Sequence, residues 1–321
     1  MFMSPDMVTL PLLYKRDWDG FVEGPYWPGW WIQNSFGPSY GMMPFFGEPY
    51  RTWIRHAQGL WFNMMGDGKR AGTNGYIAPD GSLMDCAFLY LNGKPENGFG
   101  DLRGKARGSV RDFDGSIHTE IAVYRQGDGN TQEYDWYYGG AAAGIIMEAE
   151  RLLVTRDPQE ISLRLPQLQR VAAFLDACRD PKTNLLRGGR SSNLLAPSFG
   201  GVKQADGSYA TAYLTELSVN YCAALERLAI LCEMTRQTSQ AAKYRKTLAD
   251  VRAALPALME PEGYFIRFME EDGTRHGIFG ADKFGYFEAT PNHDAVALGV
   301  VDDNQSDAII SKMLSIPQLY P

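Results

Sequence analysis

Apolar residues recur at helical spacing along much of the chain, most clearly in residues 211–234. One stripe of that segment consists of Leu214, Leu217, Tyr221, Leu225, Leu228 and Cys232. Further apolar residues lie on the opposite side, and a helix that is apolar almost all round is buried on most sides. The following segment, residues 239–259, carries lysine, arginine and aspartate along one face, which indicates a partly solvated helix. The two segments therefore predict a buried inner helix followed by a charged outer helix.

The same periodicity predicts further helices, separated by loops rich in glycine and polar residues. They span about residues 49–65, 80–91, 134–154, 164–178 and 291–298, with a last helix that starts near Asp303. A repeated order of helix, loop and helix is typical of stacked αα-hairpins. We therefore expect the helices at 134–154, 211–234 and 291–298 to be inner helices around one axis, with their starts on the same side.

Two segments predict β-structure instead. Residues 109–125 contain a turn at Asp114-Gly115 followed by a short alternating strand. Residues 263–277 alternate apolar and polar positions around an Asp272-Gly273 turn, which predicts a β-hairpin between two helical hairpins.

The N-terminal part of the chain is rich in glycine, proline and aromatic residues. Residues 24–41 place Trp27, Trp30 and Trp31 between glycines and prolines, which interrupt both helix and strand. A loop with such rings either packs them onto a core or offers them as a binding platform, and both interpretations stay open. In the second one, the indoles stack on a sugar ring, and Gln33 and Asn34 bind its hydroxyl groups.

Composition and motifs exclude several classes of protein. The net charge is −7 and the basic residues are scattered, whereas binding to nucleic acid requires a clustered basic surface. No window reaches about 18 consecutive apolar residues, so no membrane span is expected. The four histidines form no HExxH motif and the four cysteines no CxxC pair, so we expect no metal site and buried free thiols. Dinucleotide and P-loop fingerprints are missing, and no cofactor is expected.

We interpret the 321 residues as one domain, with an aromatic and glycine-rich part over residues 1–110 and helical hairpins over residues 111–321. The first ten residues have neither a basic region nor an apolar region, so we do not expect them to form a signal peptide. Localisation stays open between the cytoplasm and export after removal of a signal. The oligomeric state is equally open.

Four stretches of the chain are similar to one class of enzymes in the order of their helices and loops and in their local composition. They are YDWYYGGAAAG at a helix start, TNLLRGGR after the next helix, the inner helix LTELSVNYCAALERLAILCEM, and GYFEATPNHDAVALGVVDD. These stretches resemble the six-hairpin glycosidases, which include α-L-rhamnosidase-like, trehalase-like and maltose-phosphorylase-like enzymes, and they single out no one family. The resemblance implies a mainly α fold, an (α/α) toroid of helical hairpins with short β-hairpins, and a sugar substrate. A complete toroid has six hairpins, and only four or five are expected here.

Glycoside hydrolysis needs two carboxyl groups, one that protonates the leaving oxygen and one that activates water or attacks the sugar. In enzymes of this class, such acids lie at the ends of inner helices and in the loops that lead into them. Four carboxylates of this chain fall at such places, namely Asp135, Glu216, Glu288 and Asp294. We expect at least two of them to approach each other across one open cleft, with the Trp27–Trp31 loop as a wall of that cleft.

Each of these acids also has a purely structural explanation. Asp135 can stabilise a helix start through the helix dipole, and Glu216 can form an ion pair with Arg227. The two acids near Thr290 can belong to a capping arrangement in which Thr290 is the N-cap.

Neighbouring residues complete the predicted site. Trp136, Tyr137 and Asn292 are expected to bind the substrate, an oligosaccharide or glycoside. His293 keeps a second hypothesis open, a sugar epimerase or polysaccharide lyase with a histidine as base. A third hypothesis is a non-catalytic carbohydrate-binding protein. The number of acids at helix starts favours the glycoside hydrolase, with neither nucleic acid nor a membrane as partner.

Overall fold

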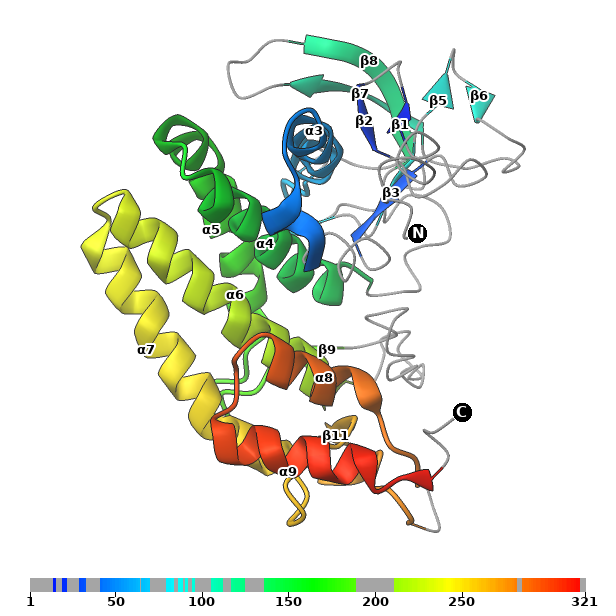
Figure 1. Cartoon of the computed structure of the whole chain (residues 1–321), viewed down its shortest axis with the longest axis vertical. Helices are drawn as coiled ribbons and strands as arrows, with labels where there is room; N and C mark the ends of the chain where they lie inside the picture. Colours follow the sequence, from blue (N-terminus) through cyan, green and yellow to red (C-terminus); the bar gives the residue numbers. More distant parts are fainter. Residues whose placement is uncertain are drawn as a thin grey trace, which may run out of the picture. The chain divides into compact units, whose positions relative to one another are not determined.

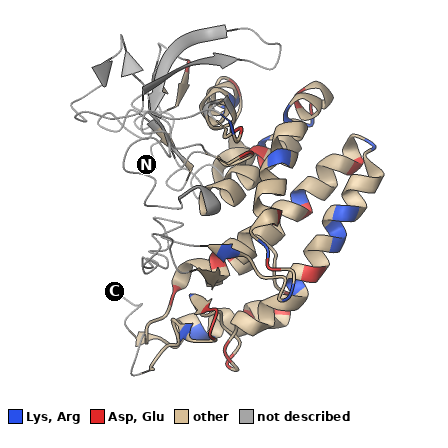
Figure 2. Cartoon of the chain, turned by 180° about the vertical axis from the view of Figure 1, so that it is seen from behind, with Lys and Arg blue, Asp and Glu red and all other residues tan. Residues whose placement is uncertain are grey.

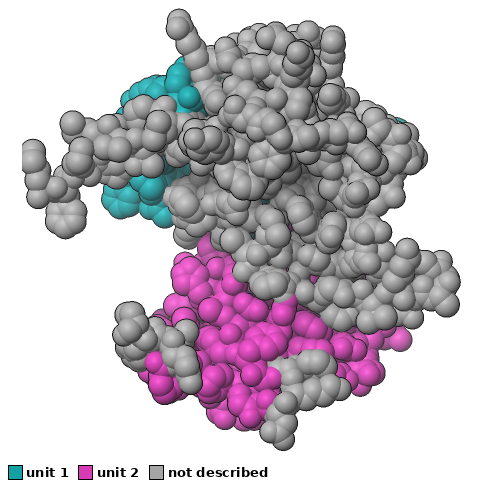
Figure 3. Space-filling view, turned by 90° about the vertical axis from the view of Figure 1, so that its right-hand side faces the viewer, with its two compact units in different colours: residues 1–133, 143–174 teal, residues 134–142, 175–321 magenta. Residues whose placement is uncertain are grey.

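The structure of the chain is a computed structural model (Figure 1). It describes residues 14–15, 19–21, 29–32, 41–63, 65–69, 79–83, 86–88, 90–91, 94–95, 105–111, 117–124, 136–188, 211–281 and 285–317. The chain divides into two compact units, unit 1 with residues 1–133 and 143–174 and unit 2 with residues 134–142 and 175–321 (Figure 3). The interpretation of the chain as one domain with a boundary near residue 110 stays a prediction.

The two strongest helical segments form a hairpin in unit 2. Helix α6 spans Thr215–Met234 and helix α7 spans Thr238–Ala254, side by side in Figure 1. A 3-10 turn over Leu255–Leu258 follows α7. Most residues of α6 are buried. The exposed face of α7 carries Lys243, Arg245 and Lys246 (Figure 2). This contrast confirms the predicted pair of a buried helix and a charged, partly solvated helix.

Helix α8, residues Ala289–Ala297, packs against α6 and begins two residues before the predicted start. Its N-cap is Glu288, whose side chain makes no capping hydrogen bond. Pro291 is therefore the third residue of the helix, where a missing N–H leaves no helical hydrogen bond unmade. The alternative that made Thr290 the N-cap is wrong, because Thr290 lies inside the helix.

Helix α9, residues Asp303–Leu314, packs against α8 and begins where the sequence predicts it. The Asp302 carboxylate accepts a hydrogen bond from the Gln305 N–H at 2.9 Å, and the Gln305 side chain accepts one from the Asp302 N–H at 3.3 Å. This reciprocal capping box satisfies two N–H groups at the start of the helix.

An antiparallel sheet of unit 2 holds the start of α6. Its strands are β9 (Arg187–Gly188), β10 (Ala212–Leu214), β11 (Phe268–Glu270) and β12 (Arg275–His276), in the order β12-β11-β10-β9. Strands β11 and β12 are the predicted hairpin, and Gly273 takes a positive φ of 91° in its turn. The segment predicted as helix from residue 211 begins as strand β10, so the helix starts only at Thr215. The sheet thereby fixes the backbone directly before Glu216.

Three long helices precede α6 in the sequence. Helix α3 spans Tyr50–Asn63, α4 spans Trp136–Thr155 and α5 spans Pro158–Ala177. All three were predicted, but α5 begins six residues earlier, because the Asp157 side chain accepts hydrogen bonds from the N–H groups of its first turn. None of the described helices combines the length and the apolar character needed to cross a bilayer. How α4 lies relative to α6 and α8 stays a prediction.

The described part of unit 1 also contains antiparallel strands and a 3-10 turn over Met43–Phe45. The strands are β1 (Tyr14–Lys15), β2 (Gly20–Phe21), β3 (Gly29–Trp31), β4 (Cys86–Phe88), β5 (Tyr90–Leu91), β6 (Lys94–Pro95), β7 (Lys105–Arg111) and β8 (Ile117–Tyr124). Strand β8 confirms the strand predicted after Asp114-Gly115, and β7 pairs with it. The helix predicted over residues 80–91 is wrong, because β4 and β5 occupy its second half and pair with β3 and β8. A short apolar run cannot be assigned to helix or strand by periodicity alone.

A buried charge network joins three helices of unit 1. The Glu148 carboxylate on α4 is fully buried and accepts hydrogen bonds from Arg151 at 2.9 and 3.1 Å and from Arg164 at 3.0 Å. Arg151 also donates to Glu160 at 2.6 Å, and Glu160 pairs with Arg55 of α3 at 3.2 Å. Burial acts against ionisation of Glu148, but the two guanidinium groups prevail and lower the pKa of Glu148. In this network each of the two carboxylates is bonded to two guanidinium groups.

The cysteines with a described side chain are free thiols. Cys222 and Cys232 are buried, as predicted, and Cys178 is partly buried. Burial raises the pKa of the Cys222 thiol to about 12, so this thiol is neutral and behaves as a small apolar side chain.

Candidate active site

Three of the predicted carboxylates come together in unit 2, where α6 packs against α8. Glu216 is the second residue of α6, Glu288 directly precedes α8, and Asp294 lies on α8. The charges of Asp294 and Glu288 both act on Glu216. All three side chains are largely buried, with 9% of Glu216 and 6% of Asp294 exposed and 12% of the Glu288 side chain exposed. We call these three residues the acid cluster.

The three acids differ in their surroundings. Burial raises the pKa of Glu216 well above its ordinary value, Asp294 and Glu288 raise it further, and Arg267 opposes them. Burial also raises the pKa of Glu288, but there the nearby Arg267 guanidinium acts in the opposite direction. For Asp294, burial raises the pKa, while His293 and a hydrogen bond from Asn220 lower it. Burial and the two neighbouring acids therefore both favour the protonated form of Glu216.

This shift predicts a pH-dependent stability. An unfolded chain releases the Glu216 proton near the ordinary pKa of 4.5, whereas the folded chain holds it to higher pH. The folded protein therefore loses stability as the pH rises above 4.5, until the folded pKa is passed. We expect the Glu216→Gln variant to be more stable than the wild type at pH 7, and this advantage to shrink as the pH falls toward 4.5. Urea unfolding at several pH values measures it, and an advantage independent of pH would contradict the raised pKa.

Arg267, which the sequence did not single out, lies against two members of the acid cluster. Its Nε is 3.6 Å from the Glu288 carboxylate, and its Nη1 donates to the Tyr286 hydroxyl at 2.8 Å. Its carbonyl oxygen accepts the Thr215 N–H at 3.2 Å, directly before Glu216. The strand alternation predicted at residues 264–268 places Arg267 opposite the buried apolar residues. That pattern normally indicates a solvated position, and here the same face meets the acids.

The close approach around Arg267 depends on one glycine. The Arg267 N–H donates to the His276 carbonyl at 2.8 Å, and the next residue, Gly277, has a φ of 84°. A Cβ at Gly277 would lie 2.8 Å from the Arg267 nitrogen, closer than such contacts permit. Glycine is therefore required both for the left-handed backbone and for the space next to Arg267.

Asn292 is not available to a substrate, which corrects the expectation for this residue. Its side chain is fully buried. Its Oδ1 accepts from the Phe265 N–H at 2.7 Å, and its Nδ2 donates to the carbonyl oxygens of Phe265 and Glu288, both at 2.9 Å. Three of the four hydrogen-bonding positions of the carboxamide are thus used by the backbone. Asn220, which the sequence also did not single out as a site residue, is the asparagine that contacts an acid, Asp294.

His293 lies at the edge of the acid cluster. Its Nδ1 is 3.1 Å from the Asp294 carboxylate, and 70% of its side chain is exposed. The second hypothesis, with His293 as base, stays a prediction.

Of the three tryptophans predicted to form an aromatic platform, the structure describes the side chain of Trp30. Trp30 lies on strand β3 rather than in a loop, and only 6% of it is exposed. Its ring packs between Phe21 and Trp61, with centroids 6.2 and 6.4 Å away, and its carbonyl oxygen accepts the Trp61 Nε1–H at 2.8 Å. Trp30 is therefore a core residue of unit 1 and does not offer its face to a sugar. The pairing of β3 with β4 places Trp30 in a strand. No local sequence pattern predicted that pairing.

Other predicted site residues lie outside the described part of the chain. They are Trp27, Gln33, Asn34 and Asp135, together with the side chains of Trp31, Trp136 and Tyr137. Their roles stay predictions, as does the cleft that they would line.

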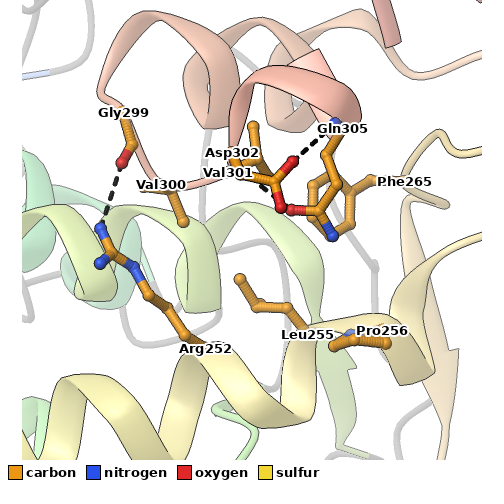
Figure 4. A pocket seen from close by; sticks show the side chains of 9 residues that line it. All are labelled: Arg252, Leu255, Pro256, Phe265, Gly299, Val300, Val301, Asp302 and Gln305. Atoms are coloured by element: carbon orange, nitrogen blue, oxygen red, sulfur yellow. Dashed lines mark hydrogen bonds between the residues drawn. The ribbon is translucent and has the colours of Figure 1, made fainter. Parts of the chain in front are cut away.

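A cavity of about 300 Å³ in unit 2 is separate from the predicted carboxylates (Figure 4). It is lined by Arg252, Leu255, Pro256, Phe265, Gly299, Val300, Val301, Asp302 and Gln305. Its polar groups complete helix ends, because Asp302 and Gln305 form the capping box of α9 and Arg252 donates to the Gly299 carbonyl at 3.1 Å. Among the described residues, no group of three His, Cys, Asp or Glu side chains is arranged to hold a metal ion.

Solved structures of glycosidases share this arrangement of elements. A GH63 mannosylglycerate hydrolase from Thermus thermophilus matches 95% of this chain and 74% of its own, at 12% identity and a TM-score of 0.59. A GH78 family rhamnosidase of Bacillus sp. GL1 matches 93% of this chain, at 14% identity and a TM-score of 0.58. The fold is that of the six-hairpin glycosidases. The mainly helical fold predicted from the sequence is thereby confirmed.

The likeness concerns the fold and not the sequence. No protein-family model matches this chain, and no curated protein matches it. The chain spans 24% of the length of the Bacillus rhamnosidase. It spans 39% of a rhamnosidase from Klebsiella oxytoca, which matches 83% of this chain at 13% identity and a TM-score of 0.49.

Proposed function

We propose that this chain carries the active site of a glycoside hydrolase, with Glu216 as the general acid and Glu288 as the second catalytic carboxylate. The observation that carries the proposal is the acid cluster itself, in which one carboxyl group retains its proton while another faces a guanidinium group. Two carboxyl groups with separated protonation states are what glycoside hydrolysis requires. The glycosidase fold supports the same conclusion.

The proposed reaction follows from these two states. Glu216 donates its proton to the glycosidic oxygen, the bond from that oxygen to the anomeric carbon breaks, and the leaving group departs as an alcohol. Glu288 either takes a proton from the water that attacks the anomeric carbon, or attacks that carbon itself to form a glycosyl ester. In the second route Glu216, now ionised, takes a proton from the water that cleaves this ester and releases the sugar and the Glu288 carboxylate. Arg267 stabilises the ionised form of Glu288 that both routes need. Asp294 adds a second negative charge that keeps Glu216 protonated.

The substrate is proposed to be an oligosaccharide or another glycoside. Because similar structures include a rhamnosidase and a mannosylglycerate hydrolase, the first probes are 4-nitrophenyl α-L-rhamnoside, 4-nitrophenyl α-D-mannoside and mannosylglycerate. We expect turnover of at least one probe by the wild type, and loss of turnover in the Glu288→Gln variant with its fold intact by circular dichroism. The anomer formed first, followed by proton NMR, distinguishes direct attack by Glu288 from attack by water.

The same assay tests the non-catalytic alternative. Binding of a probe sugar by calorimetry without any release of product would support a carbohydrate-binding protein and contradict the hydrolase. Turnover that persists in the Glu288→Gln variant would remove Glu288 from the mechanism.

A further inference from the structure

The buried amide of Asn292 connects two segments that are distant in sequence. Its Oδ1 and Nδ2 bind both backbone groups of Phe265, and Nδ2 also binds the carbonyl oxygen of Glu288. Between Phe265 and Glu288 the chain passes through both strands of the β11–β12 hairpin and an eleven-residue stretch, 277–287. One side chain therefore sets the separation of these two segments at this point.

Those two segments carry the two partners of an ion pair of the acid cluster. Phe265 lies two residues before Arg267, and Glu288 is itself held through its carbonyl oxygen. The Arg267 backbone is in turn bonded to Thr215, directly before Glu216. The start of α6 is thus bonded to the segment 265–267 through the Arg267 carbonyl, and the Asn292 side chain bonds the same segment to the Glu288 carbonyl.

Glu288 lies at the start of α8, where it is held through its backbone. It is the N-cap residue, with an extended backbone at φ −91° and ψ 109°. Arg267 and the Thr290 backbone both lower the pKa of its carboxyl group, and the Asn292 amide holds the carbonyl of the same residue.

We propose that Asn292 is a positioning residue, whose amide holds the Glu288 backbone at a fixed separation from the Arg267 segment so that the Glu288 carboxylate faces the guanidinium. For its effect on turnover, this inference rests on the proposed function. Asn292 touches no substrate in this role. It acts through the position of Glu288. A small misplacement of a catalytic group lowers turnover, and we expect substrate binding to change less.

Two substitutions at this position separate placement from simple stability. In Asn292→Ser the side chain is too short to reach both segments, so all three bonds are lost. In Asn292→Asp the acceptor for the Phe265 N–H remains, but an oxygen replaces Nδ2 and faces the two carbonyl oxygens until it is protonated. The matched control is Ser218→Ala, because Ser218 is also fully buried and accepts one backbone hydrogen bond, from Leu186 at 3.1 Å.

The first readout needs no substrate. Carbon-13 NMR of side-chain-labelled glutamate follows the titration of Glu288, assigned by its disappearance in Glu288→Gln. Because the Arg267 guanidinium lowers the pKa of Glu288, we expect the Glu288 titration in Asn292→Ser, where the carboxylate no longer faces that guanidinium, to move to higher pH. Ser218→Ala is expected to leave it unchanged. In Asn292→Asp we expect the same displacement of the Glu288 titration while the aspartate at position 292 is ionised. The displacement should diminish when that aspartate is protonated.

The second readout is turnover of whichever probe the wild type cleaves. We expect kcat of Asn292→Ser to fall about ten- to hundred-fold with little change in KM, and kcat of Ser218→Ala to stay at the wild-type value. If Asn292→Ser loses stability like Ser218→Ala while Glu288 titration and kcat stay unchanged, the residue is only structural and the proposal is overturned. If Asn292→Ser does not fold, the pH response of Asn292→Asp gives the same test. Absence of turnover in the wild type contradicts the proposed function alone, because the titration still decides the role of Asn292.

Discussion

In the Glu216→Gln variant, kcat for a disaccharide substrate is expected to fall about 10²- to 10⁴-fold, the usual contribution of a general acid. Glutamine has nearly the same shape as protonated glutamic acid but has no proton to donate. A sugar leaving group departs as a basic alkoxide unless it is protonated, so the loss of the acid affects it strongly. A 2,4-dinitrophenyl glycoside releases a weakly basic anion, and its hydrolysis should be almost unaffected in the bond-breaking step.

The contrast between leaving groups distinguishes an acid from a base. The control variant Glu288→Gln is expected to lose activity on both substrates, because the second carboxylate acts at the anomeric carbon and not at the leaving oxygen. Steady-state kinetics on the two substrates with the three proteins measure the difference. Equal losses on both substrates in Glu216→Gln would mean that Glu216 is not the proton donor.

Removal of the buried carboxylate of unit 1 is expected to destabilise the protein strongly. Glu148→Gln leaves Arg164 buried without its carboxylate partner, and leaves Arg151 with Glu160 alone. Breaking a buried ion pair in this way typically lowers the free energy of unfolding by about 3–5 kcal/mol, because a charge stays in the interior without its partner. Urea denaturation followed by circular dichroism measures the loss.

The matched control is the same substitution at an exposed ion pair. Glu233 pairs with Arg245 at 2.8 Å, and about half of each side chain is exposed. Glu233→Gln should therefore change the free energy of unfolding by less than about 1 kcal/mol. A Glu148→Gln variant as stable as the Glu233→Gln variant would show that the arginines of the network find other partners or water.

The long helices of this chain were predictable because their signal is local. The apolar perimeter of residues 215–234 and the charged face of 238–254 are properties of consecutive residues, and they led to the correct hairpin of α6 and α7. The Asp272-Gly273 turn is equally local and led to β11 and β12. The segment at 86–91 was mistaken for helix because its state depends on pairing with strands far away in the sequence.

The candidate site was predictable to the same extent. Glu216, Glu288 and Asp294 stood out because acids at helix starts are visible in the sequence, and the packing of α6 against α8 brings them together. Arg267 and Asn220 were missed as partners of these acids, and Asn292 was given the wrong role. Their contacts come from strands and helices that are neighbours only in the folded chain.

The sequence by itself determined the order of helices and loops, the burial of α6 and a set of four candidate acids at helix starts, because each of these follows from residue type and spacing within one segment. Only the tertiary structure decided that Trp30 is a core residue, that the Asn292 amide is used by the backbone, and that Asp294 and Glu288 raise the pKa of Glu216. The physical reason is that burial and electrostatic interaction depend on distances between side chains. Those distances are set by the packing of segments that lie far apart in the chain, and no local pattern of residues contains them.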